Sequence, residues 1–358
     1  MDGRDVLASG IVERIGEDEV DTHEDALKIV KKRLKKSNVL EDWSELDAIG
    51  HRVVHGGEYF HKPTIIDDEV IEKIDSLTSL APLHNPANIL GIKVSIEHAP
   101  KVAQVAVFDT AFHQSIPKYA YMYALPYKMY EKYGVRRYGF HGTSHNYVAS
   151  EASKFLNREY SESNFISLHL GNGSSVTAIK NGKSIDTSMG MTPLEGLIMG
   201  TRSGDIDPQI IIYLAKELNM SIGEIDVMLN KKSGLLGVSG ISDMREIQAS
   251  NDEKAKLALD MVVYRLKKYI GSYAVALGRV DALIFTGGIG EHSEIIRKNV
   301  CDELDILGIS IDSDKNKNVK KDIVDISANS SKSKVLVIST NEELEIALQT
   351  QKILRGEI

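Results

Sequence analysis

The residues best suited to chemistry lie within residues 169–208, a stretch rich in glycine that carries one arginine. The apolar run 165–170 ends in Gly-Asn-Gly-Ser-Ser, residues 171–175, where small residues let backbone N–H groups close on an anion. Arg202 stands further along among glycines, and its forked guanidinium can bind a phosphate or a carboxylate. The stretch predicts a phosphate-handling site, with an ordinary glycine-rich hairpin and a solvated arginine as the alternative.

Three side chains upstream are further candidates. Arg52 lies on the expected strand 47–54, where a buried arginine needs an anion partner and an edge arginine is merely solvated. Asp109 follows the apolar run 102–108, and the carboxyl end of a buried strand is a usual place for a metal-binding or catalytic group, although a helix N-cap is the simpler alternative. His141 lies between glycines, which indicates a loop that passes close to a ligand; a hydrogen-bonded structural histidine is the alternative.

His141 and His145 have the i, i+4 spacing of a helical metal pair. The zinc-protease pattern needs a glutamate directly after the first histidine, and Gly142 occupies that place. A metal hydrolase that uses both histidines together with His169 is therefore the weaker reading, and it predicts stoichiometric zinc and turnover without nucleotide.

A second glycine-rich loop follows the expected strand 282–286 and runs from Gly287 to Ser293. Its Gly-x-Gly-x-x-Ser pattern is too loose for a dinucleotide fingerprint, but it lets a nucleoside or phosphate lie against bare backbone. Asp243, in the expected loop 234–245, is a natural helix N-cap. Glu342 opens the last helix, where complementing the helix dipole is the simplest role and metal binding the alternative.

The length and the order of the elements predict two α/β domains. At 358 residues the chain exceeds the size at which a single core stops growing. Strands are expected at 47–54, 102–108, 165–170, 176–180, 282–286 and 334–338, and helices at 24–36, 144–156, 208–219, 222–230 and 252–277. Asn181-Gly182 predicts a tight hairpin between two of the strands.

Composition excludes several classes of protein. The formal net charge of −8 argues against general attraction to nucleic acid or to acidic membrane surfaces. A single cysteine, Cys301, rules out an intramolecular disulfide framework and fits the reducing cytoplasm. No apolar run is long enough to span a membrane.

Motifs spread over nearly the whole chain together resemble the acetate kinase family. They are HRVVHGGE (51–58), FDTAFHQ (108–114), YGFHGTSH (138–145), HLGNGSS (169–175), GTRSGDIDP (200–208), FTGGIGE (285–291) and TNEE (340–343). The resemblance implies two ribonuclease H-like domains of the actin, Hsp70 and sugar-kinase type, with ATP in the cleft between them. The implied domains are residues 1–111 plus 342–358, whose first strand is missing, and residues 112–341.

The resemblance also implies the reaction. A carboxylate oxygen of acetate attacks the γ-phosphate of ATP in line and needs no general base, so catalysis must come from positioning and charge neutralisation. Arg52 and Arg202 are implied to hold the acetate carboxylate and the transferring phosphoryl group, and His141 to hydrogen-bond the equatorial oxygens of that group. Asp109 is implied to be the essential acid near Mg²⁺ and Arg202.

Further contacts follow from the same resemblance. Glu342 matches a metal-associated glutamate for Mg²⁺, with Mn²⁺ as the alternative ion. A small apolar pocket for the methyl group matches Val54, Leu83, Phe140 and Pro193. The ATP or ADP site matches two sets of residues, His169, Leu170, Gly171, Asn172 and Gly173 at the phosphates, and Asp243, Met244, Arg245, Gly288, Ile289, Gly290, Glu291 and His292 at the nucleoside.

Alternatives within the family remain open. A small apolar pocket separates acids that differ by one methylene by only about 10- to 200-fold, so propionate is also expected to react, and a kinase for propionate or another short-chain fatty acid is the nearest alternative. A relative that binds ATP without catalysis is another. The family suggests a homodimer formed through the second domain.

Two features depart from the family pattern. His292 stands where many relatives have asparagine, which predicts altered base or ribose contacts. Relatives begin with a strand and an N-x-G-S-S-S-x-K turn that binds Mg²⁺ and phosphate, and nothing similar precedes Asp5. We therefore expect either that the chain begins at an internal methionine or that it lacks one wall of its active site and has strongly reduced activity.

Overall fold

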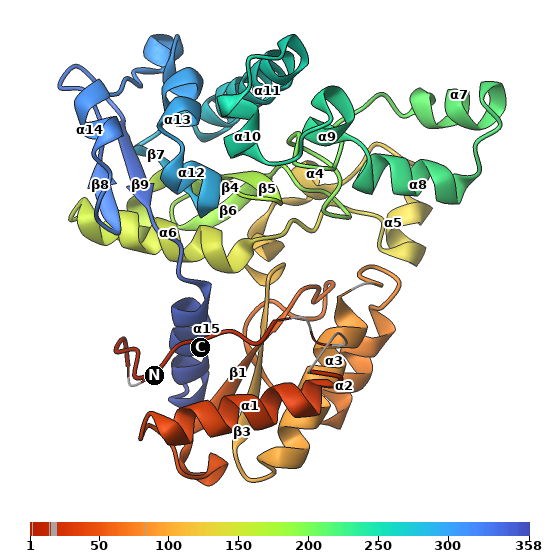
Figure 1. Cartoon of the computed structure of the whole chain (residues 1–358), viewed down its shortest axis with the longest axis vertical. Coiled ribbons are helices and arrows are strands. Elements are labelled where there is room, and N and C mark those ends of the chain that lie inside the picture. The colour runs from red at the N-terminus through yellow and green to blue at the C-terminus, as the bar shows by residue number, and fades with distance from the viewer. Residues whose placement is uncertain (2, 14, 16–19, 83) are drawn as a thin grey trace. The chain divides into compact units, whose positions relative to one another are not determined.

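The computed structural model describes residues 1, 3–13, 15, 20–82 and 84–358. The chain divides into two compact units, which we describe separately (Figure 1). Unit 1 comprises Met1–Phe112 and Asn341–Ile358, and unit 2 comprises His113–Thr340. Unit 1 is therefore built from both ends of the chain.

Unit 1 contains a three-stranded sheet in the order β1-β3-β2. Strand β1 (Ala48–Val53) pairs in parallel with β3 (Ala103–Phe108), and β2 (Thr64–Ile65) pairs antiparallel with β3. This register sets Arg52 opposite Val107, so the chain reaches Asp109 one residue after the end of β3. The parallel pair thus carries two of the predicted site residues to the same edge of the sheet.

In the described part of unit 1 this sheet is accompanied by the helices α1 (His23–Lys36), α2 (Asp68–Ser76), α3 (Asn85–His98) and α15 (Glu342–Leu354), together with the 3₁₀ turn Trp43–Glu45. A Cβ atom added at Gly50 would lie 2.6 Å from Thr350 Oγ1 and 2.7 Å from Ile346 Cγ2. Only glycine in β1 therefore lets the last helix pack this closely on the strand. That packing brings Glu342, at the start of α15, to the Arg52 end of β1.

Unit 2 is built on a six-stranded mixed sheet in the order β6-β5-β4-β7-β9-β8. Its strands are β4 (Asn164–Leu170), β5 (Ser174–Lys180), β6 (Lys183–Thr187), β7 (Ala282–Thr286), β8 (Ile323–Asp325) and β9 (Lys334–Ile338). Strands β4, β7 and β9 run parallel, whereas β5, β6 and β8 are antiparallel to their neighbours. The predicted hairpin at Asn181-Gly182 is confirmed, since both residues adopt the positive φ of a tight turn, 51° and 72°.

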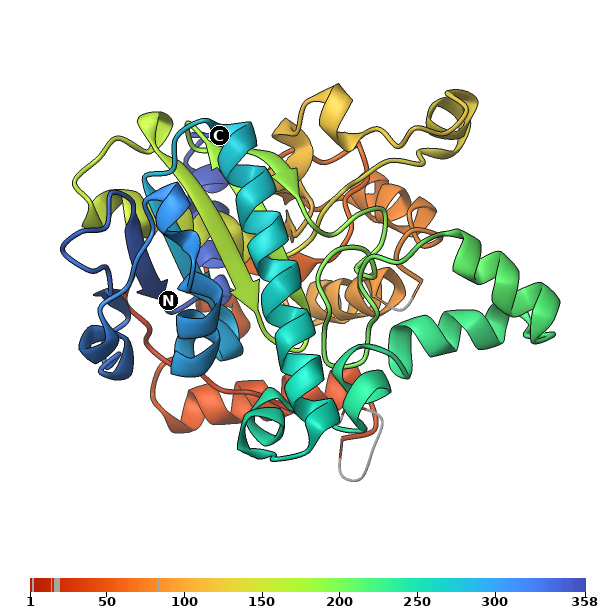
Figure 2. The ribbon, with the colours of Figure 1, turned by 90° about the horizontal axis from the view of Figure 1, so that it is seen from above.

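The two faces of this sheet are covered by different helices, α6 (Gly142–Phe155) and α11 (Glu253–Leu277) (Figures 1 and 2). Alternate residues of β4 face opposite ways, so Ile166, Leu168 and Leu170 join the apolar core beneath α11. Ser167 and His169 take the other face and bond to side chains of α6. One face of the sheet is therefore apolar and the other carries a polar cluster.

The remaining helices of unit 2 are shorter. They are α4 (Lys118–Tyr121), α5 (Lys128–Tyr133), α7 (Gln209–Glu217), α8 (Ile222–Lys231), α9 (Gly234–Ser239), α10 (Met244–Ala249), α12 (Gly287–His292), α13 (Glu294–Cys301) and α14 (Ser313–Lys317). Two expected loops are thus wrong, because 234–245 contains α9 and 287–293 contains α12. Both segments are rich in glycine, and tertiary contacts override their weak intrinsic preference for helix.

Candidate active site

The candidate residues of unit 1 form an ion-pair cluster. Arg52 donates hydrogen bonds from Nε and Nη2 to the two carboxylate oxygens of Asp109, with the Nε–Oδ1 distance 3.2 Å. The Arg52 Nε atom also lies 3.8 Å from Oε2 of Glu342. The carboxylate of Asp109 is buried, whereas the Arg52 side chain is 47% exposed. The structure therefore brings these three predicted residues together, with an Arg52 side chain that is still partly exposed to solvent.

The cluster contains two carboxylates and one guanidinium, so its negative charge is only partly neutralised. Burial and the nearby charge of Asp109 raise the pKa of Glu342 to about 7, and Arg52 only partly opposes this shift. The same Asp109 carboxylate raises the pKa of Arg52. Two carboxylates that share one arginine are a suitable oxygen donor set for a hard divalent cation, and Mg²⁺ typically uses one or two carboxylates together with phosphate oxygens. The residues present therefore fit a magnesium ion.

The loop that follows Arg52 is held by two asparagines, of which Asn85 is buried and Asn88 is partly exposed. Asn88 Oδ1 accepts the backbone N–H of Val54 at 3.1 Å, and Asn85 bonds both the N–H and the C=O of His55. Val54, predicted to contact the methyl group, is 5% exposed. Leu83, predicted for the same pocket, lies outside the residues that the structure describes.

In unit 2, His141 occupies an unusual backbone position. It precedes α6 with φ 56° and ψ 23°, a left-handed conformation that non-glycine residues rarely adopt. Such local strain persists when surrounding contacts hold it, and it is common at functional sites. The flanking Gly139 packs closely inside the unit, since an added Cβ would lie 2.4 Å from Thr187 Cγ2 and 2.7 Å from His113 Cδ2.

The tip of His141 and the tip of Arg202 face the same point of the glycine turn. A Cβ atom added at Gly173 would lie 3.2 Å from His141 Nε2 and 3.6 Å from Arg202 Nη1. Both donor groups therefore adjoin the turn that was predicted to bind phosphate. Phe140, next to His141, is 3% exposed, and Pro193 accepts a 3.3 Å hydrogen bond from Arg202 Nη1 through its carbonyl oxygen.

Arg202 has the properties of an anion-binding residue. Among the described residues, no carboxylate lies within ion-pair distance of its guanidinium, which donates hydrogen bonds to the Pro193 carbonyl and the Met199 sulfur. Burial lowers its pKa, and no neighbouring acid compensates for this desolvation. A partly buried guanidinium without an acidic partner is unfavourable unless a ligand supplies the negative charge.

Four histidines lie close together on the polar face of the unit 2 sheet. The rings of His141 and His169 stack with their centroids 4.3 Å apart, and His145 lies 6.5 Å from the first and 6.2 Å from the second. His113 lies 5.9 Å from His145. Burial lowers the pKa of His113 to about 4 and the pKa of His145 well below its ordinary value, so both are neutral near pH 7.

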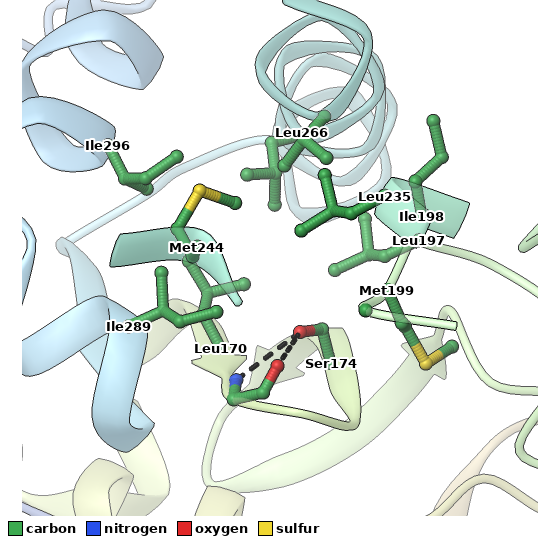
Figure 3. Close-up of a pocket in the computed structure, with 13 residues that line it drawn as sticks. Leu170, Ser174, Leu197, Ile198, Met199, Leu235, Met244, Leu266, Ile289 and Ile296 are labelled. Carbon is green, nitrogen blue, oxygen red and sulfur yellow. Dashed lines mark hydrogen bonds between the residues drawn. The ribbon is translucent and has the colours of Figure 1, made fainter. Parts of the chain in front are cut away.

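The predicted nucleotide residues occupy three elements of unit 2. Four of them, Leu170, Gly171, Met244 and Ile289, line one apolar pocket together with Leu197, Met199, Leu235 and Leu266 (Figure 3). Met244 and Ile289 lie on one side of this pocket and Leu197 and Leu235 on the other. The turn closes its end, where Ser174 Oγ donates to the Gly171 carbonyl at 3.1 Å.

The pocket is narrow. Its cavity volume of ≈ 20 Å³ has room for about one water molecule. The Met244 and Ile289 side chains must therefore separate before a purine ring can enter between them.

The other predicted nucleotide residues lie outside this pocket lining. Glu291 Oε1 accepts the backbone N–H groups of Gly287 at 2.9 Å and Thr340 at 3.1 Å, so its carboxylate ties α12 to the end of β9. Asp243 is the predicted N-cap, which is confirmed by its bond from the Arg245 N–H, and the Arg245 side chain lowers the pKa of Asp243 to about 2. His169 lies on β4, Asn172 and Gly173 lie in the turn that follows it, and Gly288, Gly290 and His292 lie in α12.

Sequence reasoning missed the serines that organise the histidines. Ser175 Oγ lies 2.9 Å from His141 Nδ1 and 2.8 Å from His145 Nε2, and Ser167 Oγ lies 2.9 Å from His145 Nδ1. Alternation along β4 and β5 could have placed these serines on the α6 face. The alternative zinc site is not favoured, since both nitrogens of His145 bond to serines and no cluster of three potential metal ligands occurs among the described residues.

Within the part of the chain that the structure describes, no helix combines the length and apolarity needed to cross a membrane.

Known proteins that resemble the chain match it over nearly its full length. The Acetokinase family model matches residues 8–348. The chain is 52% identical to an acetate kinase of Campylobacter lari over 375 aligned positions, covering 99% of this chain and 95% of that protein. It is also 52% identical to an acetate kinase of Helicobacter acinonychis, covering 97% and 93%.

Solved structures give the same result. An acetate kinase from Porphyromonas gingivalis has a TM-score of 0.90 at 47% identity, covering 94% of this chain and 86% of the other. A propionate kinase from Francisella tularensis has a TM-score of 0.87 at 49% identity, covering 92% and 85%. These matches confirm the predicted two-domain α/β fold of the actin, Hsp70 and sugar-kinase type. With a family model that spans both units, the chain belongs to the acetokinase family.

Proposed function

We propose that the chain is an acetate kinase that transfers the γ-phosphoryl group of ATP to acetate and runs the reverse reaction from acetyl phosphate and ADP. In the forward direction a carboxylate oxygen of acetate forms a bond to the γ-phosphorus while the bond to the β,γ-bridging oxygen breaks. The carboxylate is already a nucleophile, so no proton has to be removed. The protein must therefore place the two reactants in line and neutralise the charge between them.

The observation that carries this proposal is the joint approach of His141 Nε2 and Arg202 Nη1 to Gly173. Arg202 supplies a positive charge without an acidic partner among the described residues, and His141 supplies a hydrogen-bond donor. The turn offers backbone N–H groups at the same place. These groups suit a phosphoryl unit whose negative charge is spread over three oxygens.

The predicted roles of the remaining residues form part of the proposal. Arg52 binds the anionic substrate with the face of its guanidinium that stays open to solvent, and Asp109 fixes the orientation of that guanidinium. Asp109 and Glu342 would hold Mg²⁺, or Mn²⁺ in its place, with substrate phosphate oxygens as further ligands. When bound, the metal supplies neutralisation of the phosphate charge. The apolar pocket beside Leu170 takes the nucleoside after Met244 and Ile289 move apart.

The test is direct formation of acetyl phosphate. The purified chain, ATP, Mg²⁺ and acetate are incubated, and acetyl phosphate is trapped with hydroxylamine. Arg202→Lys keeps a positive charge but loses the forked donor geometry, and we expect kcat to fall about 100-fold or more. Arg279→Lys is the matched control, since the exposed Arg279 side chain pairs with Asp281 and the change should leave turnover unchanged. Absence of acetyl phosphate from the unaltered chain would contradict the proposal.

A kinase for propionate is the second candidate, because one solved relative at 49% identity is described as a propionate kinase. The two activities are separated by comparing kcat/KM for acetate, propionate and butyrate under the same conditions. We expect acetate to be preferred, with propionate slower by a factor of about 10 to 200. A higher kcat/KM for propionate would assign the chain to the second activity.

The chain is further proposed to act in the cytoplasm as a homodimer formed through unit 2. Unit 2 exposes apolar side chains on α7 and α8, including Ile212 at 45%, Tyr213 at 60% and Ile222 at 70% exposure. Apolar patches of this kind are typical of protein contacts. Sedimentation analysis at micromolar concentration should give twice the 39.5 kDa mass of the chain, and a species of 39.5 kDa would contradict dimerisation.

A further inference from the structure

The polar face of the unit 2 sheet contains an unbroken chain of side-chain hydrogen bonds that ends at His141. It runs from Ser167 Oγ to His145 Nδ1 at 2.9 Å, from His145 Nε2 to Ser175 Oγ at 2.8 Å, and from Ser175 Oγ to His141 Nδ1 at 2.9 Å. Ser167, His145 and Ser175 are all 0% exposed. Water therefore cannot replace a missing partner within these three residues.

The donors in such a chain can be counted. Each serine hydroxyl has one proton, and a neutral imidazole has one N–H and one bare nitrogen. Ser175 faces two histidine nitrogens, so its proton can satisfy only one of them. The other histidine must donate its own N–H to the Ser175 oxygen. The tautomers of His141 and His145 are therefore coupled through Ser175.

Only one direction satisfies every donor of the three buried residues. If Ser167 donates to His145 Nδ1, then His145 Nε2–H donates to Ser175 and Ser175 donates to His141 Nδ1, so the protons of Ser167, His145 and Ser175 all have acceptors. In the opposite direction His145 Nδ1–H donates to Ser167, and the Ser167 proton has no acceptor among the described residues. A buried donor without an acceptor is unfavourable, so the first direction prevails.

We propose that His145 is a positioning residue which, held by Ser167 and acting through Ser175, fixes His141 as a neutral imidazole whose proton is on Nε2. That nitrogen is the one that lies beside Gly173 and Arg202. This chain of hydrogen bonds, which we call the relay, therefore turns the Nε2–H of His141 toward the transferring phosphoryl group. The bare Nδ1 of His141 faces Ser175. This inference rests on the proposed kinase function for its role, although the tautomer itself can be measured without turnover.

The surroundings of His141 favour the neutral ring as well. Groups that face it include the stacked imidazole of His169 on β4, the ring of His145 on α6 and the guanidinium of Arg202 in the loop between β6 and α7. None of these is an acid that would stabilise an imidazolium. The His141 ring is therefore suited to donate one hydrogen bond and not to supply a full positive charge.

The first measurement is the ¹⁵N NMR spectrum of the whole chain with labelled histidine. The His141 and His145 signals are assigned by their loss in His141→Gln and His145→Gln. We expect both residues to show a protonated Nε2 and a bare Nδ1, which resonates far downfield. A protonated Nδ1 on either residue would overturn the relay. Because this readout needs no catalysis, a chain that forms no acetyl phosphate but shows these tautomers would refute the kinase function alone.

The second measurement uses Ser175→Ala, which removes the bridging hydroxyl. We expect the His141 nitrogen signals to move toward each other as the two tautomers exchange, and kcat for acetyl phosphate formation to fall about tenfold, less than loss of a direct donor would cause. Ser175→Thr keeps the hydroxyl and should restore both. Thr177→Val is the matched control, since Thr177 is a buried hydroxyl on the same strand that bonds Thr187 and not a histidine. Unchanged His141 signals in Ser175→Ala would contradict the coupling.

Discussion

At the residue scale, the histidine group shows how burial fixes a chemical state. His113 Nε2 faces the carbonyl oxygen of Phe140 at 2.9 Å, so that nitrogen must carry the proton, and Ser184 then donates to Nδ1. Burial lowers the pKa of His113 to about 4, with the nearby Arg137 contributing in the same direction. The folded chain therefore holds this ring neutral at a pH where the unfolded chain would protonate it.

The sign of the resulting pH dependence follows from linkage. Between about pH 6.5 and pH 4 the unfolded state binds a proton that the folded state does not, so the stability contributed by neutral His113 is complete above pH 6.5 and is lost as the pH falls. The full loss is on the order of 3 kcal/mol. We expect His113→Gln to flatten the dependence of the unfolding free energy on pH in this window. Urea unfolding at several pH values measures it, and identical slopes for both chains would contradict the assignment.

At the element scale, the loop between β6 and α7 that carries Arg202 is held at two points. Arg137 Nη2 lies 2.7 Å from Glu195 Oε1, and the Tyr123 hydroxyl donates to the same carboxylate. Further along, Asp205 accepts the Gly196 N–H at 2.8 Å and the Tyr269 hydroxyl at 2.7 Å. The loop is therefore positioned by side chains that do not themselves face the candidate phosphate site.

Glu195→Gln tests whether the ion pair with Arg137 positions this loop. The amide keeps the shape of the side chain but loses the charge that pairs with Arg137, and we expect the free energy of unfolding to fall by about 1–3 kcal/mol. Activity should fall with it, about tenfold in kcat, because Arg202 loses its fixed position. Glu217→Gln makes the same change at an exposed position of α7 and should alter stability by no more than about 0.5 kcal/mol. Equal effects of Glu195→Gln and Glu217→Gln would argue against a positioning role for the Glu195–Arg137 ion pair.

Gly234 packs directly against the backbone of Met199 and Arg202. It has φ 62°, and an added Cβ would lie 2.1 Å from the Met199 carbonyl oxygen and 2.7 Å from that of Arg202. Gly234→Ala must therefore displace the Arg202 backbone, and we expect kcat to fall about 100-fold, since small misplacements at a reacting centre are costly.

The control for that change is Gly223→Ala. Gly223 lies in α8, and an added Cβ there meets nothing within 4 Å. Alanine should be neutral or should stabilise the chain by up to about 1 kcal/mol. Full activity in Gly234→Ala would show that the loop adapts without moving Arg202.

The sequence predicted the apolar strands well and the short glycine-rich helices poorly. Strands 282–286 and 334–338 were predicted at the bounds that the structure has, because each is an apolar run ended by a turn residue or a charge. The short helices α9 and α12 were missed because glycine lowers helix propensity, whereas Gly234 and Gly287 are needed there for close backbone approach. The Arg52–Asp109 pair could be predicted from the two strand ends, but the link from Ser175 to His141 is a contact in three dimensions between β5 and the residue before α6, which the sequence does not reveal.

At the scale of the whole molecule, unit 1 is discontinuous in sequence and unit 2 is not. Helix α15 packs on β1 around Gly50 and supplies Glu342 to the ion-pair cluster. Unit 2 contains its own six-stranded sheet within residues 113–340. The two units therefore depend differently on the last eighteen residues, 341–358, of the chain.

Removal of residues 341–358 tests this dependence. Without α15 the Gly50 face of β1 loses its cover, so we expect residues 1–112 to become sensitive to protease while a fragment near 113–340 persists. Limited proteolysis followed by mass spectrometry identifies the surviving fragment. Equal resistance of residues 1–112 in the full and shortened chains would contradict the dependence.

Because unit 1 is built from both ends of the chain, the two units can be completed at different times during biosynthesis. Unit 2 has all of its strands once Thr340 has been made, so its native sheet does not depend on the last helix. Unit 1 must wait with an incomplete core until the final helix has emerged from the ribosome. The segment made first is therefore the one that finishes folding last, and during translation it is the part with the greatest need for a chaperone.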